Sequence, residues 1–140
     1  MAREDQSGDW AGRFSPSLDE IESIAIETLA RLPQEFRALC GDLIIQIADF
    51  PDDQIVEDMG LDTPFDLMGL FEGQGIGQRF SLQTGDTPNR ITLFRRAILD
   101  YWAEHQETLG DIVAHVLIHE IGHHFGLSDA DIQAIEDQAE

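Results

Sequence analysis

The sequence contains no lysine, so its eight basic side chains are all arginines, and they face 28 acidic residues. The formal charge of −20 argues against nucleic-acid partners and anionic membranes, because both need a positive protein surface. Enzymes that act on nucleic acid, including metal-dependent hydrolases, are therefore disfavoured. The same charge would repel acidic substrates and favour basic or neutral ones, although solubility alone also accounts for it.

Cysteine and long apolar runs are almost as scarce. Cys40 is the only cysteine, so no disulfide can form within the chain, which fits a reducing compartment. Its neighbours Leu39 and Leu43 predict a buried thiol. No apolar run approaches the ~20 residues of a membrane span, and the acidic N-terminus lacks the apolar core of a signal peptide. We therefore expect a cytoplasmic bacterial protein with no membrane partner.

The length of 140 residues and the 42% hydrophobic content suit one globular domain with a real core. Residues 1–16 are polar and glycine-containing, which predicts a flexible tail followed by a single domain over 17–140. Ser17 and Glu20 form a capping pattern that starts a helix, which Pro33 ends. Further helices are expected at 52–59 and 95–105, and strands at 43–48, 66–71, 79–82 and 91–94.

This order of elements predicts an α+β fold, in which a small mixed β-sheet packs against helices. Between the second and third strands, the glycines of 73–77 suggest a phosphate loop. They lack the Lys-Ser/Thr pair of such a loop and a clear following helix, so a hairpin or mobile flap is the better interpretation.

The most informative stretch is His119-Glu120-Ile121-Gly122-His123, which has the spacing H-E-x-x-H. At ~100° per residue, His119 and His123 share one helix face and Glu120 lies beside them. Thr108 and Asp111 predict the start of this helix near Leu109. Apolar residues cover most of its circumference, so the helix is expected to be buried. Polar groups in such a helix need partners, and a metal ion supplies them.

A third ligand is predicted after the helix. Gly126 can take a positive φ and turn the chain back, and Asp129 follows three residues later. His119, His123 and Asp129 would make a three-ligand site with an open position, which is typical of catalytic zinc, with one Zn²⁺ per chain. Alternatively, Asp129 is only a first-turn residue of a helix capped by Ser128.

Two other histidines in the helix are not expected to bind this ion. His115 is ~12 Å from His123 along the helix axis, too far for one ion to bind His115, His119 and His123 together. His115 is at most an outer neighbour of the site. His124 points ~100° away from His123, toward the packed side of the helix.

The pattern H-E-x-x-H-x-x-G-x-x-D resembles the zincin metallopeptidases, in particular the small bacterial "minimal zincin" family. The segments 67–73 and 89–99 are similar to the glycine-tipped strand and the strand-into-helix segment of that family. The resemblance implies a zincin-like fold with a central metal-binding helix, and hydrolysis of peptide or protein substrates. It also implies that the substrate lies along an edge strand beside this helix, which it places at Ile91, Thr92, Leu93 and Phe94. An internal strand, paired by 43–48 and 66–71, is the alternative.

In the expected mechanism, zinc activates a water molecule and Glu120 is the general base that takes its proton. Tyr101 and His115 are the candidates for stabilising the developing negative charge on the substrate. The alternative function is a metal-stabilised peptide- or protein-binding module with little or no turnover. The presence of Glu120 argues against it, since a purely structural metal site has no use for an unligated acid.

Overall fold

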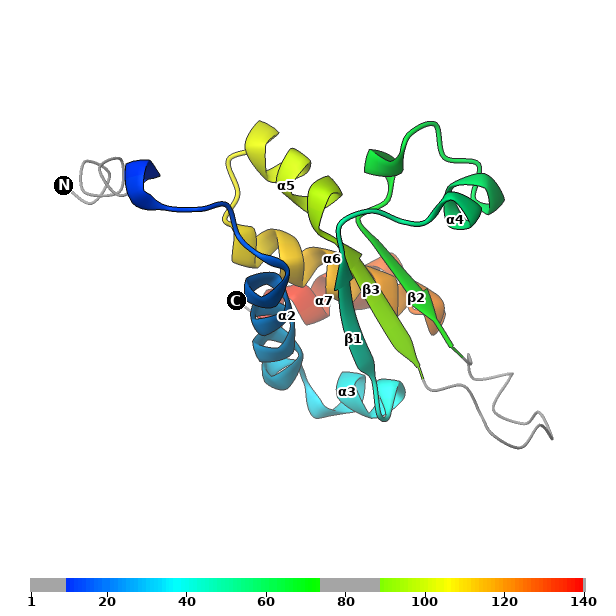
Figure 1. The fold of residues 1–140 in the computed structure, drawn as a ribbon. Coiled ribbons are helices and arrows are strands. Elements are labelled where there is room, and N and C mark those ends of the chain that lie inside the picture. Colours follow the sequence, from blue (N-terminus) through cyan, green and yellow to red (C-terminus); the bar gives the residue numbers. More distant parts are fainter. Residues whose placement is uncertain (1–9, 74–88, 140) are drawn as a thin grey trace.

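The computed structural model describes residues 10–73 and 89–139 (Figure 1). Within these residues there are two short 3-10 helices, η1 (Trp10–Gly12) and η2 (Pro64–Asp66). The α-helices are α2 (Leu18–Arg31), α3 (Gln34–Cys40), α4 (Asp53–Asp58), α5 (Arg95–Glu104), α6 (Leu109–His124) and α7 (Asp129–Ala139). The strands are β1 (Ile44–Ala48), β2 (Gly69–Glu72) and β3 (Arg90–Phe94). Residues 74–77 of the expected flap and the strand expected at 79–82 lie outside the described residues.

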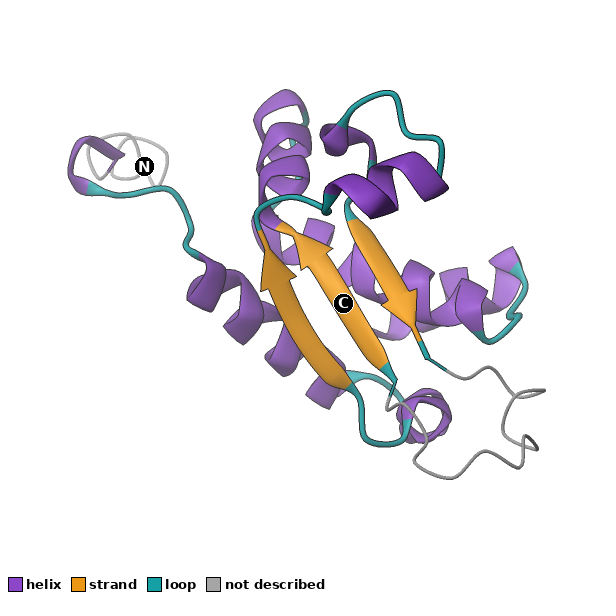
Figure 2. Cartoon of the chain, turned by 45° about the vertical axis from the view of Figure 1, so that its right-hand side comes forward, coloured by secondary structure: helices purple, strands orange, loops and turns teal. Residues whose placement is uncertain are grey.

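These elements confirm the α+β class. Figure 2 shows a small mixed sheet with helices packed behind it, and its strand order is β1-β3-β2. β1 runs parallel to β3, with Ile45 opposite Ile91, and β2 runs antiparallel to β3, with Gly69 opposite Leu93. The parallel pair is joined through a long connection that contains β2, which leaves β3 in the middle of the sheet.

The expectation that Ile91–Phe94 forms an unpaired edge is therefore wrong. The backbone groups of β3 bond to β1 on one side and to β2 on the other, so they are not available to a substrate strand. The side chains explain this central place, because Ile91 and Leu93 are fully buried (0% exposed). Among the described strands, β2 is the edge strand that lies against α6.

The core lies between the sheet and helices α2 and α6. α2 packs against β1 and α6, and α6 packs against β2 and β3. The prediction of a buried central helix is confirmed, since seven residues of α6 are buried: Ile112, Val113, Val116, Leu117, Ile118, Ile121 and Gly122. α6, which carries the H-E-x-x-H residues, also packs against α7.

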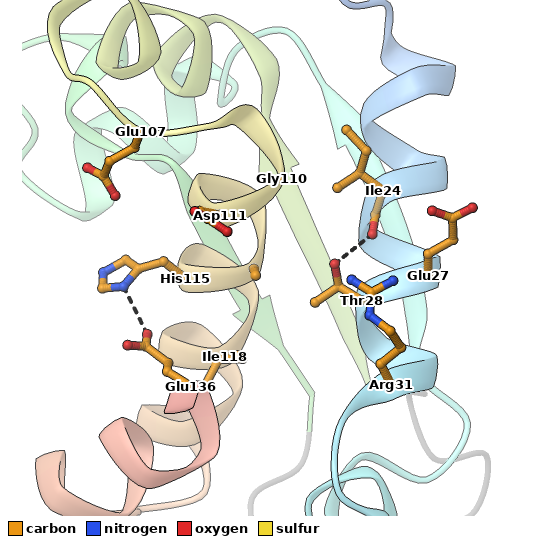
Figure 3. Close-up of a pocket in the computed structure, with 11 residues that line it drawn as sticks. Ile24, Glu27, Thr28, Arg31, Glu107, Gly110, Asp111, His115, Ile118 and Glu136 are labelled. Atoms are coloured by element: carbon orange, nitrogen blue, oxygen red, sulfur yellow. Dashed lines mark hydrogen bonds and ion pairs between the residues drawn. The ribbon is translucent and has the colours of Figure 1, made fainter. Parts of the chain in front are cut away.

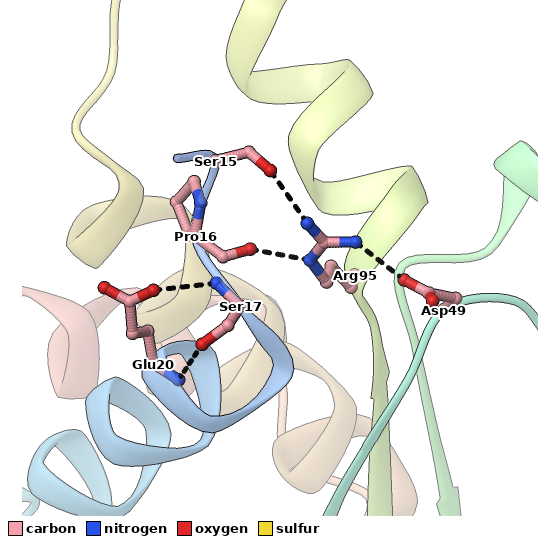
Figure 4. Close-up of polar contacts among 6 residues, drawn as sticks. All are labelled: Ser15, Pro16, Ser17, Glu20, Asp49 and Arg95. Carbon is pink, nitrogen blue, oxygen red and sulfur yellow. Dashed lines mark hydrogen bonds and ion pairs between the residues drawn. The ribbon is translucent and has the colours of Figure 1, made fainter. Parts of the chain in front are cut away.

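The start of the domain is fixed by polar contacts (Figure 4). Ser17 caps α2, because its Oγ accepts a hydrogen bond from the backbone N–H of Glu20 at 3.1 Å, as its capping pattern predicted. Arg95 donates from Nε to the carbonyl oxygen of Pro16 at 2.6 Å and from Nη2 to Ser15 Oγ at 2.9 Å. Its Nη1 also pairs with Asp49 at 2.9 Å. The guanidinium group of Arg95, the first residue of α5, therefore holds Ser15 and Pro16, the last described residues of the expected tail, next to the end of the sheet.

Candidate metal centre

Local sequence signals set both ends of α6. The Thr108 hydroxyl accepts a hydrogen bond from the N–H of Asp111 at 3.1 Å, which satisfies one of the unpaired donors at the helix start. At the other end Gly126 takes φ = 77°, and its N–H donates to the carbonyl of His123 at 3.1 Å. The glycine thus ends the helix as predicted. After this turn Ser128 caps α7, so Asp129 is placed directly beside the end of α6.

The two motif histidines lie on one accessible face. The ring centroids of His119 and His123 are 5.5 Å apart, with the rings almost perpendicular. The His119 side chain is 30% exposed and that of His123 is 55% exposed, so both reach the surface of an otherwise buried helix. This is the arrangement that the spacing predicted.

Glu120 is half-buried and lies close to β2. Its Cγ would lie 3.3 Å from a Cβ atom placed on Gly69, and Val116 Cγ1 would lie only 2.8 Å from that atom. The absence of a side chain at Gly69 is what allows the edge strand to approach α6 this closely. Burial raises the pKa of Glu120 above its ordinary value, while nearby His123 acts in the opposite direction. A carboxyl group with a raised pKa is a better proton acceptor at neutral pH.

A carboxylate lies beside each motif histidine. Asp129 Oδ1 is 3.5 Å from His123 Nε2, and the Asp129 side chain is 97% exposed. Glu136, which comes from α7, has its Oε1 2.9 Å from His119 Nε2. Within residues 10–73 and 89–139, the three predicted ligands do not form a group whose donor atoms all lie within 4.8 Å of one another.

In the described residues, the donor atoms of one group do lie within 4.8 Å of one another, and this group contains His115, His119 and Glu136. His115 Nδ1 is also 2.9 Å from Glu136 Oε1 (Figure 3). The centroids of the His115 and His119 rings are 3.9 Å apart. The pKa of His119 is lowered, first by burial and then by the nearby His115, although Glu136 opposes the shift. Sequence reasoning missed this group. Its visible signal was the i, i+4 spacing of His115 and His119, but the carboxylate comes from a different helix.

The remaining candidates have other roles. His124 packs its ring against Phe71, with centroids 4.1 Å apart, which confirms that it points to the packed side. The Tyr101 hydroxyl donates to Glu107 at 3.0 Å, and this bond is the main cause of its raised pKa. Cys40 is 2% exposed, and burial raises the pKa of its thiol to about 11. A group this buried and this protonated is not a nucleophile.

The matched family model describes a zincin-like metallopeptidase and covers residues 40–139, from the end of α3 through α7. The chain belongs to the zincin-like metallopeptidase family. The matched region of this zincin-like chain contains the sheet, α6 and both carboxylates beside the motif histidines. A search of curated proteins gave no match. In the described ranges, no helix combines the length and apolarity needed to cross a membrane.

The donor types, imidazole and carboxylate, fit the zinc that this family implies. Two imidazoles lie one helical turn apart, and a carboxylate oxygen stands 3.5 Å from one of them. Zinc bonds of 2.0–2.1 Å place tetrahedral ligand atoms about 3.3 Å apart, so this pair needs only a small adjustment. The exposure of His123 and Asp129 leaves both side chains free to turn toward a common ion.

Proposed function

We propose that this zincin-like protein is a zinc-dependent peptidase in which His119, His123 and Asp129 hold the metal and Glu120 is the general base. The observation that carries the proposal is the placement of Glu120, which is half-buried on α6 next to the motif histidines and close to Gly69 of the edge strand β2. A purely structural metal site does not need a carboxylate with a raised pKa beside its ligands.

Zinc in this site would supply Lewis-acid polarisation of the scissile carbonyl and a lowered pKa for a water molecule. Glu120 removes a proton from the attacking water and then delivers it to the nitrogen of the departing amine. Burial of its carboxyl group supports the first step, because a raised pKa favours acceptance of the proton from water. Asp129 and the two imidazoles would position the metal next to this carboxylate.

The edge strand β2 replaces β3 as the proposed path of the substrate. Met68 accepts a backbone hydrogen bond from Phe94 at 2.9 Å, and bonding alternates along an antiparallel pair. Gly69 and Phe71 therefore direct their backbone N–H and C=O groups away from β3. An extended peptide pairing with these two residues would lie beside Glu120.

The decisive experiment is the Glu120→Gln substitution. The amide is nearly isosteric, so we expect the variant to keep its zinc content and its circular dichroism spectrum. It cannot accept the proton of the attacking water, so hydrolysis of a peptide library should fall by ~10²–10⁴-fold. Equal cleavage by both proteins, purified free of other proteases, would remove Glu120 from the mechanism. Zinc binding without cleavage by the wild type would favour the metal-stabilised binding module.

A further inference from the structure

A second set of metal-binding side chains overlaps the motif. His115 Nδ1 and His119 Nε2 each lie 2.9 Å from the same oxygen, Oε1 of Glu136, and the three atoms are within 4.8 Å of one another. Two imidazoles and one carboxylate are the donor types that zinc prefers. The set is built from two helices, since the imidazoles belong to α6 and the carboxylate to α7.

The carboxylate oxygen at the centre of this group is buried. It lies 2.9 Å from a ring nitrogen of each histidine, so both imidazoles already meet at this oxygen. A buried carboxylate needs partners, and a cation bound among the three donor atoms would supply one. Tetrahedral zinc ligands lie about 3.3 Å apart, so each of the two nitrogen–oxygen distances would grow by only a few tenths of an ångström.

The surroundings of the group also favour a cation. His115 and Glu136 line a pocket of about 430 Å³ between α2 and α6, which gives an ion a route from solvent (Figure 3). Glu27, Glu107 and Asp111 line the same pocket, and among the described lining residues Arg31 is the one arginine. An excess of carboxylates around a pocket raises the local concentration of cations.

We propose that His115, His119 and Glu136 form a second, non-catalytic zinc site that shares His119 with the H-E-x-x-H motif. The Nε2 atom of His119 can bind one ion at a time, so a zinc ion bound there through His115 and Glu136 excludes one bound through His123. On an α-helix Glu120 projects about 140° from His115, so its carboxylate is turned away from this second site. Zinc held there is therefore separated from the general base, and the protein stores it without turnover.

This proposal uses the proposed function only to define the competing site, and its test needs no peptidase activity. Metal-free full-length His123→Ala protein, in which the motif site is broken, is titrated with zinc by calorimetry. His123 is 55% exposed, so its truncation should leave the fold intact. We expect the variant to bind one zinc ion. Adding His115→Ala or Glu136→Gln should weaken that binding more than about 100-fold, since loss of outer partners alone costs 10–100-fold.

A matched control and a spectroscopic readout complete the test. Asp129→Asn, added to His123→Ala, removes a proposed ligand of the motif site but none of the second site, and should change the zinc affinity by less than about threefold. In ¹⁵N-labelled His123→Ala protein, zinc should shift the imidazole nitrogens of both His115 and His119. A shift of His119 alone, or no zinc binding by His123→Ala, would overturn the second site. Two zinc ions bound per wild-type chain would overturn the sharing of His119.

Discussion

At the scale of single residues, the motif histidines differ in their carboxylate neighbours. His119 lies 2.9 Å from Glu136, whereas His123 lies 3.5 Å from Asp129. The first carboxylate is mostly buried (18% exposed) and the second is almost fully exposed (97%). The buried residue is held in place by the packing of α7 on α6, and the exposed one is free to follow the metal. Ligand identity can therefore be tested separately for each acid.

The first residue-scale prediction concerns Asp129. In a His115→Ala background, which breaks the proposed second site, Asp129→Ala should weaken zinc binding severely, because the affinity of such a site comes from all its ligands together. Asp131→Ala is the matched control, since both acids lie in the first turn of α7 and contribute alike to the helix dipole. Competition with a chromophoric chelator gives both affinities. If Asp129→Ala binds as tightly as the control, Asp129 is not a ligand, and Glu136 becomes the third ligand to test.

At this scale, the sequence predicted contacts between residues that are close together in the chain and missed contacts between residues that are far apart. His119, Glu120 and His123 follow from a fixed helical spacing, and Thr108 and Gly126 from local capping rules. The contact of Glu136 with His115 and His119 required the angle at which α7 returns along α6. No periodicity encodes that angle, so the sequence offered Asp129, the nearer acid, instead.

At the scale of elements, the close approach of β2 to α6 depends on Gly69. Gly69→Ala would place its Cβ 2.8 Å from Cγ1 of Val116, a buried β-branched side chain that cannot easily move away. We expect a loss of ~1–3 kcal/mol of unfolding free energy, as for overpacking in a core. Gly110→Ala, where a Cβ meets nothing within 4 Å, is the control and should be neutral or stabilising. Urea unfolding compares the two, and equal stabilities would show that β2 is not confined by α6.

Strand order was the part of the fold that sequence patterns did not determine. Each strand was recognisable from its apolar run, and β1 and β3 lie close to the predicted boundaries. Pairing, however, joins residues far apart in the chain, such as Ile45 and Ile91. A short apolar strand fits either the centre or the edge of a sheet, so placing β3 at the edge relied on the family resemblance alone.

The new strand order makes a prediction for hydrogen exchange. Amides of β3 should be protected in the free protein, since β3 is paired on both sides. The amides of Gly69 and Phe71 should exchange early and become protected when a hydroxamate-tipped peptide binds, because they point away from β3. Leu70, whose amide faces β3, is the internal control. If the peptide leaves Gly69 and Phe71 unchanged, β2 is not the path of the substrate.

At the scale of the whole molecule, the dominant feature is the charge of −20. Part of it gathers near the proposed catalytic helix, because Glu27, Glu107, Asp111 and Glu136 line the pocket beside α6. A negative surface next to a cleft attracts cationic ligands and repels anionic ones. We therefore expect the charge to affect which peptides reach the proposed site, whereas the proposed chemistry depends on residues of α6.

The charge predicts substrate preference and its salt dependence. Three peptides that share one cleavable core, flanked by lysines, by serines or by glutamates, isolate the effect of substrate charge. At ~10 mM salt, where the Debye length is about 30 Å, we expect kcat/KM for the lysine-flanked peptide to exceed that for the glutamate-flanked one by at least about tenfold. At ~1 M salt the Debye length falls to about 3 Å, so the three values should converge on that of the serine-flanked peptide. A preference for lysine that persists at high salt would show recognition by a specific contact, and equal rates at low salt would show that the negative charge serves solubility alone.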